Sequence, residues 1–124
     1  MKRIYIVMLV LVATGFARGD ALVGVEQDPA KVNSKYLTVK LDNDRVRVFE
    51  TTLKPGEKEA VHSHPASIAY VIEGGKFRNY APDGTVSEAE LRAGDTVYRD
   101  ALTHAAENIG KTTIRLVLVE LKGP

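Results

Sequence analysis

The chain contains no cysteine among its 124 residues. Disulfides, thiolate metal ligands and a cysteine nucleophile are therefore excluded together, and any bound metal has to be held by histidine, carboxylate or water. Histidine is scarce as well, because only His62, His64 and His104 are present. A site built from imidazoles has no other residues to draw on.

A basic cluster and a sustained helical repeat are also missing. Lys and Arg total 17 against 16 Asp and Glu, and no basic run is interleaved with aromatic residues. This argues against nucleic acid and against an anionic membrane surface as partners. No window beyond the N-terminal segment keeps a helical apolar period. With 27% charged and 44% hydrophobic residues, the composition is typical of one globular domain with a modest core.

The N-terminus has the pattern of an export signal: two basic residues, an apolar run at 4–12 and the small-residue stretch ATGFARGDA. We predict a signal peptide over residues 1–19, with cleavage after Gly19 or Ala21. An uncleaved membrane anchor is the alternative, but the apolar stretch has 14 residues, and spanning a bilayer takes about 20. Cleavage leaves 14 basic residues against 16 acidic ones. The mature chain is therefore expected to be soluble, with no membrane association, in the periplasm or outside the cell.

Short β-type runs separated by turn residues fill the rest of the chain, and apolar residues alternate within them, as in Ile114, Leu116 and Leu118. We predict an all-β domain over 36–124, preceded by a polar lead-in at 20–35. A closed barrel or a two-sheet jelly roll is favoured, because both remove or shorten exposed sheet edges. The glycines at 56, 74, 75 and 94 are expected to form tight turns with positive φ. The predicted strands are 36–41, 45–53, 67–73, 76–80, 86–91, 96–99, 103–108 and 113–121.

Two of the three histidines stand one residue apart in the stretch VHSHPASIAYVIEGG, residues 61–75. Residues i and i+2 of a strand point to the same face, so His62 and His64 present two imidazoles side by side, as metal chelation requires. His104, in the stretch RDALTHAAEN, is the remaining imidazole that could complete the site. The alternative is that His62 and His64 are exposed loop residues beside Pro65, and that His104 is an isolated hydrogen-bonding residue of the core.

Taken together, the histidine motifs resemble those of the cupin family, small β-barrels with a double-stranded β-helix (jelly-roll) fold. The first cupin motif runs glycine, five residues, HxH, a glutamate and a closing glycine, and the second places a histidine three residues before an asparagine. The resemblance covers roughly residues 45–121, with both motifs in the family's order. The matching positions are Gly56, His62, His64, Gly94, His104 and Asn108.

The chain departs from the family pattern in both motifs. The position of the family's glutamate ligand falls on Ser67 or Ile68, and neither replaces a carboxylate. The second motif lacks its proline and glycine, and the segment before His104 is one residue short. The resemblance therefore implies a divalent metal ion (Fe, Mn, Zn, Cu or Ni) held by three histidines without the usual carboxylate.

Three neutral imidazoles leave the charge of a divalent ion uncompensated and a coordination position free for water, an anionic substrate or dioxygen. Some cupin dioxygenases hold ferrous iron in a similar way. The resemblance thus implies a small-molecule enzyme, with a dioxygenase-like oxidoreductase as one form. The alternatives are a non-catalytic module that binds metal or a small ligand, and a barrel whose histidines hold no metal. A homodimer formed through the sheets is a further expectation from the family.

Glu50, in the stretch VFETTL, is the candidate for a fourth protein ligand, because its strand can cross beneath the HxH turn; the alternative is a solvated strand residue. Glu107 is predicted to face away from the side that carries His104. We expect a small, mostly apolar cavity, and metal affinity that falls below about pH 6.5, where free imidazole becomes protonated. The remaining groups that could orient a substrate are Tyr70, which is expected to point away from the metal, Arg78, Tyr80 and Tyr98.

Overall fold

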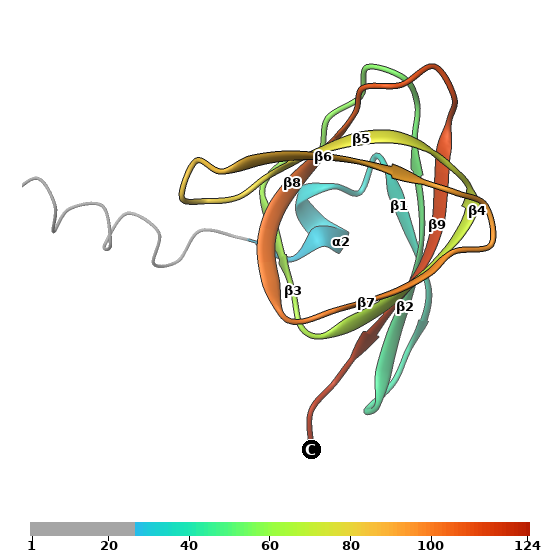
Figure 1. Cartoon of the computed structure of the whole chain (residues 1–124). Helices are drawn as coiled ribbons and strands as arrows, with labels where there is room; N and C mark the ends of the chain where they lie inside the picture. The colour runs from blue at the N-terminus through green and yellow to red at the C-terminus, as the bar shows by residue number, and fades with distance from the viewer. Residues whose placement is uncertain (1–26) are drawn as a thin grey trace, which may run out of the picture.

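The structure, a computed structural model, describes residues 27–124, so the predicted signal peptide lies outside the described residues. Within them the chain forms one short helix, α2 (Pro29–Val32), and nine strands (Figure 1). The all-β fold class is confirmed, and the eight predicted runs match strands to within one residue at each end. The strands are β1 (Leu37–Asp42), β2 (Val46–Leu53), β3 (His62–His64), β4 (Ser67–Glu73), β5 (Gly75–Tyr80), β6 (Val86–Leu91), β7 (Thr96–Arg99), β8 (Leu102–Asn108) and β9 (Ile114–Leu121).

The strands form two antiparallel sheets that face each other across the interior. One has the order β1-β2-β9-β4-β7 and the other the order β3-β8-β5-β6. Figure 1 shows the two sheets curving around a common centre, as in a jelly-roll barrel. Strands that are distant in sequence are direct neighbours, since β2 pairs with β9 and β3 pairs with β8. Both halves of the chain therefore contribute to each wall.

The core follows from two-residue alternation along the strands. In β4, Ser67, Ala69 and Val71 are buried, whereas Ile68 and Tyr70 are exposed. Because alternate residues of a strand point to opposite faces, the small side chains of β4 form part of the inner wall. The central apolar cluster, which lies between the sheets, consists of Leu37, Phe49, Ala69 and Leu118.

The helix α2 lies at one end of the barrel, against β1 and β3 (Figure 1). Asp28 caps its N-terminus by accepting a hydrogen bond from the backbone N–H of Ala30 at 3.0 Å, and Pro29 stands where no N–H is needed. Asn33, at the C-terminal cap, is 1% exposed. The sequence predicted only a polar lead-in here, whereas the structure makes this segment part of the packed domain.

The prediction of tight turns with positive φ is confirmed for two of the four glycines for which it was made. Gly56 and Gly94 have φ values of 84° and 92°, which only glycine adopts without strain. Positive φ is wrong for Gly74 and Gly75. A Cβ on Gly74 would collide with the backbone carbonyl of Leu91, so this glycine is required by the close approach of two chain segments.

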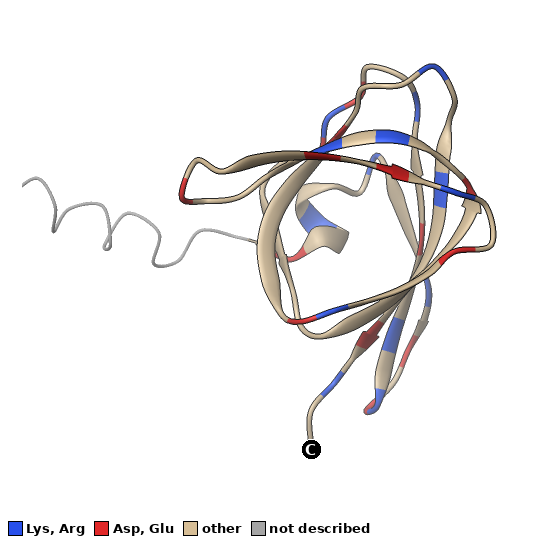
Figure 2. Ribbon diagram, in the orientation of Figure 1, with Lys and Arg blue, Asp and Glu red and all other residues tan. Residues whose placement is uncertain are grey.

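Charged side chains of both signs are interspersed over the strands and turns (Figure 2). Neither sheet carries an extended patch of one sign in this view. Among the described residues, no helix has the length and apolar character needed to cross a membrane.

Candidate metal centre

The three histidines are brought together by the pairing of β3 with β8. His62 and His64 are two residues apart on β3, and His62 lies directly opposite His104 in the β3–β8 register. Their side chains are buried, and their potential ligand atoms lie within 4.8 Å of one another. Because a metal–imidazole bond is about 2.1 Å long, small ring rotations are enough to place the three donors on one ion.

Each imidazole uses its Nδ1 atom in a hydrogen bond to an oxygen atom that can only accept. Nδ1 of His62 lies 2.7 Å from the backbone carbonyl of Ala60, Nδ1 of His64 lies 2.6 Å from a carboxylate oxygen of Glu120, and Nδ1 of His104 lies 2.6 Å from the amide oxygen of Asn79. The proton therefore resides on Nδ1 in His64 and His104, which leaves Nε2 of each of these rings with the free lone pair that binds metal. Nδ1 of His62 also lies 2.9 Å from the side-chain nitrogen of Asn33, which can only donate, so the contacts of His62 are compatible with either tautomer.

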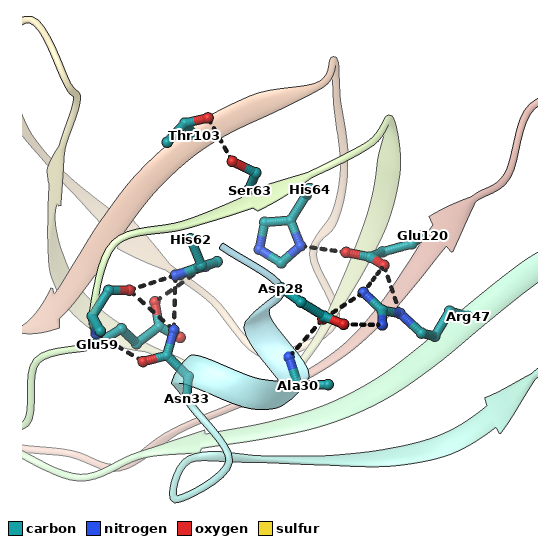
Figure 3. Close-up of polar contacts among 11 residues, drawn as sticks. Asp28, Ala30, Asn33, Arg47, Glu59, His62, Ser63, His64, Thr103 and Glu120 are labelled. Carbon is teal, nitrogen blue, oxygen red and sulfur yellow. Dashed lines mark hydrogen bonds and ion pairs between the residues drawn. The ribbon is translucent and has the colours of Figure 1, made fainter. Parts of the chain in front are cut away.

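His64 is supported by a chain of charged residues (Figure 3). Glu120, 2% exposed, accepts from His64 and forms two contacts of 2.9 Å with the guanidinium of Arg47. Arg47 in turn pairs with Asp28 at 3.0 Å, the residue that caps α2. This arrangement neutralises a buried carboxylate while fixing the ring orientation.

His62 is supported by the other end of α2 (Figure 3). The Asn33 side chain donates to the carbonyl of Ala60 at 3.0 Å and accepts from its N–H at 2.7 Å, and its nitrogen also lies 2.9 Å from Nδ1 of His62. Between the two histidines, the Ser63 backbone N–H donates to the carbonyl of Gln27 at 2.8 Å. Residues 27–33, which pack against the core cluster through Ala30, therefore help to position β3.

Burial keeps two of the rings neutral. It lowers the pKa of His62 to about 4 and that of His104 to about 3, and the neighbouring imidazoles lower both further when protonated. Three convergent neutral nitrogens fit a divalent ion of the first transition series or zinc. Because His62 and His104 are protonated only at lower pH than free imidazole, the loss of metal affinity that their protonation causes is expected below the value of about pH 6.5 predicted from the sequence.

Glu59 is the residue that sequence reasoning missed. Its carboxylate lies 3.8 Å from Nε2 of His62, the nitrogen that faces the centre, and the residue is 9% exposed. Burial raises the pKa of this carboxyl to about 7. Glu59 belongs to the stretch LKPGEKEA, whose proline and glycine signal only a turn. The one available signal was an acidic residue three positions before the first histidine.

A cavity of about 60 Å³ adjoins the histidines. Its two charged side chains are Glu59 and Arg99, and burial lowers the pKa of the Arg99 guanidinium. The volume accommodates a ligand of a few non-hydrogen atoms, given that one water takes about 10–15 Å³ on this measure. The apolar part of the wall, which bears out a mostly apolar cavity, comprises Leu37, Leu53, Phe77, Leu91, Ala106, Ile114, Leu116 and Leu118.

Glu50 is not brought to the histidines, so it is wrong as a fourth ligand. Its carboxylate pairs with Arg115 at 2.7 Å on the other face of β2 from the buried Phe49. Glu107 accepts a hydrogen bond from the Tyr80 hydroxyl, away from the centre as expected. None of the four groups suggested for substrate orientation lines the cavity. Tyr70 and Tyr98 are at least half exposed, Tyr80 contacts Glu107, and Arg78 pairs with Glu88.

Ser67 and Ile68 are the two sequence positions that could correspond to the glutamate of the cupin motif. Ser67 is 1% exposed at the start of β4 and Ile68 is exposed, so neither position brings a carboxylate to the interior. The structure instead places the carboxyl group of Glu59, which precedes the HxH pair in the sequence, 3.8 Å from Nε2 of His62.

Comparison with known proteins agrees with this geometry. The family model for the cupin domain matches residues 49–120. A cupin domain from Bordetella pertussis has 25% identity and a TM-score of 0.65, with 81% of this chain and 100% of that chain covered. An uncharacterized double-stranded β-helix protein from Klebsiella pneumoniae has 28% identity, a TM-score of 0.57 and coverage of 70% and 76%. A predicted oxalate decarboxylase from Thermotoga maritima has 20% identity, a TM-score of 0.53 and coverage of 70% and 79%. A search of curated proteins gives no match.

Proposed function

The chain belongs to the cupin family, and from this membership and the arrangement of its imidazoles we propose that it binds one divalent metal ion. His62, His64 and His104 would hold the ion through their Nε2 atoms. The observation that carries the proposal is the convergence of three buried imidazoles whose ligand atoms lie within 4.8 Å of one another, with the Nδ1 protons of His64 and His104 donated to oxygen acceptors. Such outer partners fix the tautomer and the ring direction of metal-binding histidines.

We further propose that the protein is a metal-dependent enzyme that acts on a small molecule in the adjoining cavity. A bound divalent ion supplies Lewis acidity at an oxygen atom of that molecule. Glu59 provides a carboxyl group beside His62 that can hold or release a proton near neutral pH, because burial raises its pKa to about 7. The apolar walls exclude water from the reacting groups. An oxygen-dependent oxidoreductase is the form of this proposal to test first.

The alternative is a binding module that holds metal or a small ligand without turnover. It is favoured by the presence of a single carboxyl group within the cavity lining, since many reactions need both an acid and a base. Oxygen uptake and substrate loss with the iron-loaded protein, beside its Glu59→Gln variant, would separate the two. Turnover that depends on Glu59 supports the enzyme, whereas tight ligand binding without turnover across iron, manganese, zinc, copper and nickel supports the module.

The metal site is tested by elemental analysis of purified protein after equal loading. The wild type is expected to hold about one ion per chain, and His62→Ala, His64→Ala and His104→Ala are each expected to lose it. Ser87→Ala, an exposed position on β6, is the matched control. Metal missing from the wild type, or kept by all three histidine variants, would refute the proposal.

Export and homodimer formation also stay predictions. Cell fractionation with N-terminal sequencing of the mature protein tests the first, with a new terminus after Gly19 or Ala21 expected. Light scattering of the purified protein tests the second. A full-length chain retained in the cytoplasm would contradict export, and a monomeric mass would contradict the dimer.

A further inference from the structure

We propose that Arg99 binds the carboxylate group of a small ligand inside the barrel. The inference deepens the proposed function, on which it rests for the presence of a ligand in the cavity beside the metal. It names the chemical class of that ligand, a small carboxylic acid in its ionised form, and the side chain that recognises it.

Arg99 reaches into the cavity from the sheet that does not carry the histidines. It is the last residue of β7, in the five-stranded sheet, and it lines the cavity with Glu59 and the three imidazoles. Its Cζ atom lies 6.0 Å from the ring centroid of Phe77 on β5, which belongs to the opposite sheet. The partly buried guanidinium therefore lies on the cavity side of β7, near Phe77 of the opposite sheet.

The guanidinium has no direct partner within residues 27–124. No hydrogen bond and no carboxylate within 4.0 Å engages it, and Glu59 acts on its charge only from a greater distance. Arg47, also partly buried, shows the contrast, because two carboxylates lie at 2.9–3.0 Å from its nitrogens. A partly buried guanidinium whose five N–H donors have no acceptor among residues 27–124 is set up to receive an acceptor from a ligand.

The charges around the cavity specify an anion. With neutral imidazoles, one divalent ion and Arg99 bring three positive charges, and Glu59 supplies at most one negative charge. Buried charges persist only when they are paired. A ligand that carries two negative charges balances the remaining two positive charges and a singly charged anion offsets one of them, whereas a neutral or cationic ligand leaves both uncompensated.

The geometry of the guanidinium donors and the size of the cavity together indicate the chemical class of the ligand. A guanidinium presents parallel N–H donors that match the two oxygens of a carboxylate. The cavity of about 60 Å³ admits only a few non-hydrogen atoms. A small mono- or dicarboxylate meets both conditions, with one end on Arg99 and another oxygen free to approach the histidine nitrogens.

The test measures binding of acetate, malonate and inorganic phosphate by calorimetry, with the zinc-loaded and the metal-free protein, and with metal content assayed in parallel. Malonate is expected to bind the wild type and to bind Arg99→Gln at least tenfold more weakly, because hydrogen bonds to charged groups are lost. Arg99→Lys should be intermediate, and Arg45→Gln, which removes an exposed charge elsewhere, should match the wild type. The Arg99 Nε–H resonance should shift on malonate addition.

Equal malonate affinity in wild type and Arg99→Gln would overturn the inference, as would a stationary Arg99 resonance in the wild type, which needs no variant to fold. Tighter binding of phosphate than of malonate would overturn the carboxylate class. Metal bound without Arg99-dependent carboxylate binding refutes this inference alone. Arg99-dependent binding of malonate by a protein that takes up no metal supports the inference and refutes the proposed function.

Discussion

His64 and His104 face the same point in the barrel but are supported by opposite kinds of neighbour. His64 donates to a carboxylate, Glu120, whose charge is balanced by Arg47. His104 donates to the neutral amide of Asn79. The first support is a chain of charges that ends on α2, and the second is a single side chain on β5.

The difference distinguishes two effects that a residue can have when it accepts the Nδ1 hydrogen bond of a metal-binding histidine. Both acceptors fix the tautomer and the direction of the ring. Only the carboxylate also makes the imidazole a stronger electron-pair donor to a metal and offsets part of the charge of a bound ion. This support requires a buried ion pair, which costs desolvation energy. The five predictions that follow remove, probe or exchange the groups around the three histidines.

The largest effect is expected from Glu120→Ala. The change leaves the partly buried Arg47 without its main partner and frees the Nδ1 proton of His64. We expect the free energy of unfolding to fall by roughly 3–5 kcal/mol and metal affinity to weaken about 10- to 100-fold. Urea unfolding and a competitive metal titration measure the two effects. Glu90→Ala, at an exposed glutamate of β6, is the control, and a Glu120→Ala protein as stable as that control would show that the charge chain contributes nothing.

The metal-free protein should lose stability in acid through His62 and His104. Their folded pKa values are about 4 and about 3, against 6.5 in the free side chain. Between these values the unfolded state binds more protons, so the free energy of unfolding falls as pH drops from about 6.5 to about 4, by up to roughly 3 kcal/mol for one site. Urea unfolding at several pH values measures the slope.

Glu59 works in the opposite direction, which provides a check on that slope. Its pKa is raised from 4.5 to about 7, so its folded carboxyl binds the extra proton and its stabilising contribution is lost as pH rises through 7. Glu59→Gln removes this opposing effect and should make the slope between pH 4.5 and 6.5 steeper. An unchanged or shallower slope would contradict the assignment of a buried, protonated Glu59.

Asn33→Ala tests the support of His62 from α2. The change removes two partly buried hydrogen bonds to Ala60 and the contact with Nδ1 of His62, so we expect a loss of about 1–3 kcal/mol and weaker metal binding. Ser34→Ala, at the exposed next position, is the matched control for thermal unfolding and metal titration. Equal metal affinity in the two variants would show that the support from α2 does not contribute to metal binding.

Asn79→Asp converts the neutral support of His104 into a charged one. If charge explains the contrast between the two histidines, this variant should bind metal up to about tenfold more tightly, whereas Asn79→Ala should bind about tenfold more weakly. The same metal titration measures both. Equal affinity of the wild type and Asn79→Asp would mean that orientation alone matters at His104.

The strands and the placement of His62 beside His64 could be read from the sequence because both depend on local periodicity. His104 could not be placed in this way and was assigned because it is the remaining histidine and matches the second cupin motif. The three-residue strand β3 was too short to stand out as a run of its own, and residues 20–35 gave no periodic signal for the four-residue helix α2.

The supports of the centre could not be predicted, since they are contacts between distant parts of the chain. In the sequence, Glu120 is one charged residue in an apolar strand. It lies beside Arg47 and His64 only because β9 pairs with β2 and β4. Glu59 lies in an irregular segment, where side-chain direction does not follow from spacing. Glu50 was favoured for its strand position, yet its side chain lies on the outer face with Arg115.

The chain of contacts from α2 to His64 has a consequence for the order of events during folding. Glu120 lies 56 positions after His64 and 73 after Arg47, on the last strand, so the supported form of the centre is absent until that strand has been inserted. Contacts of such long range form late. Under the proposed function, a chain that is still unfolded would have no formed centre with which to discriminate among metals, and the ion bound would be set by the metals available where the complete chain folds.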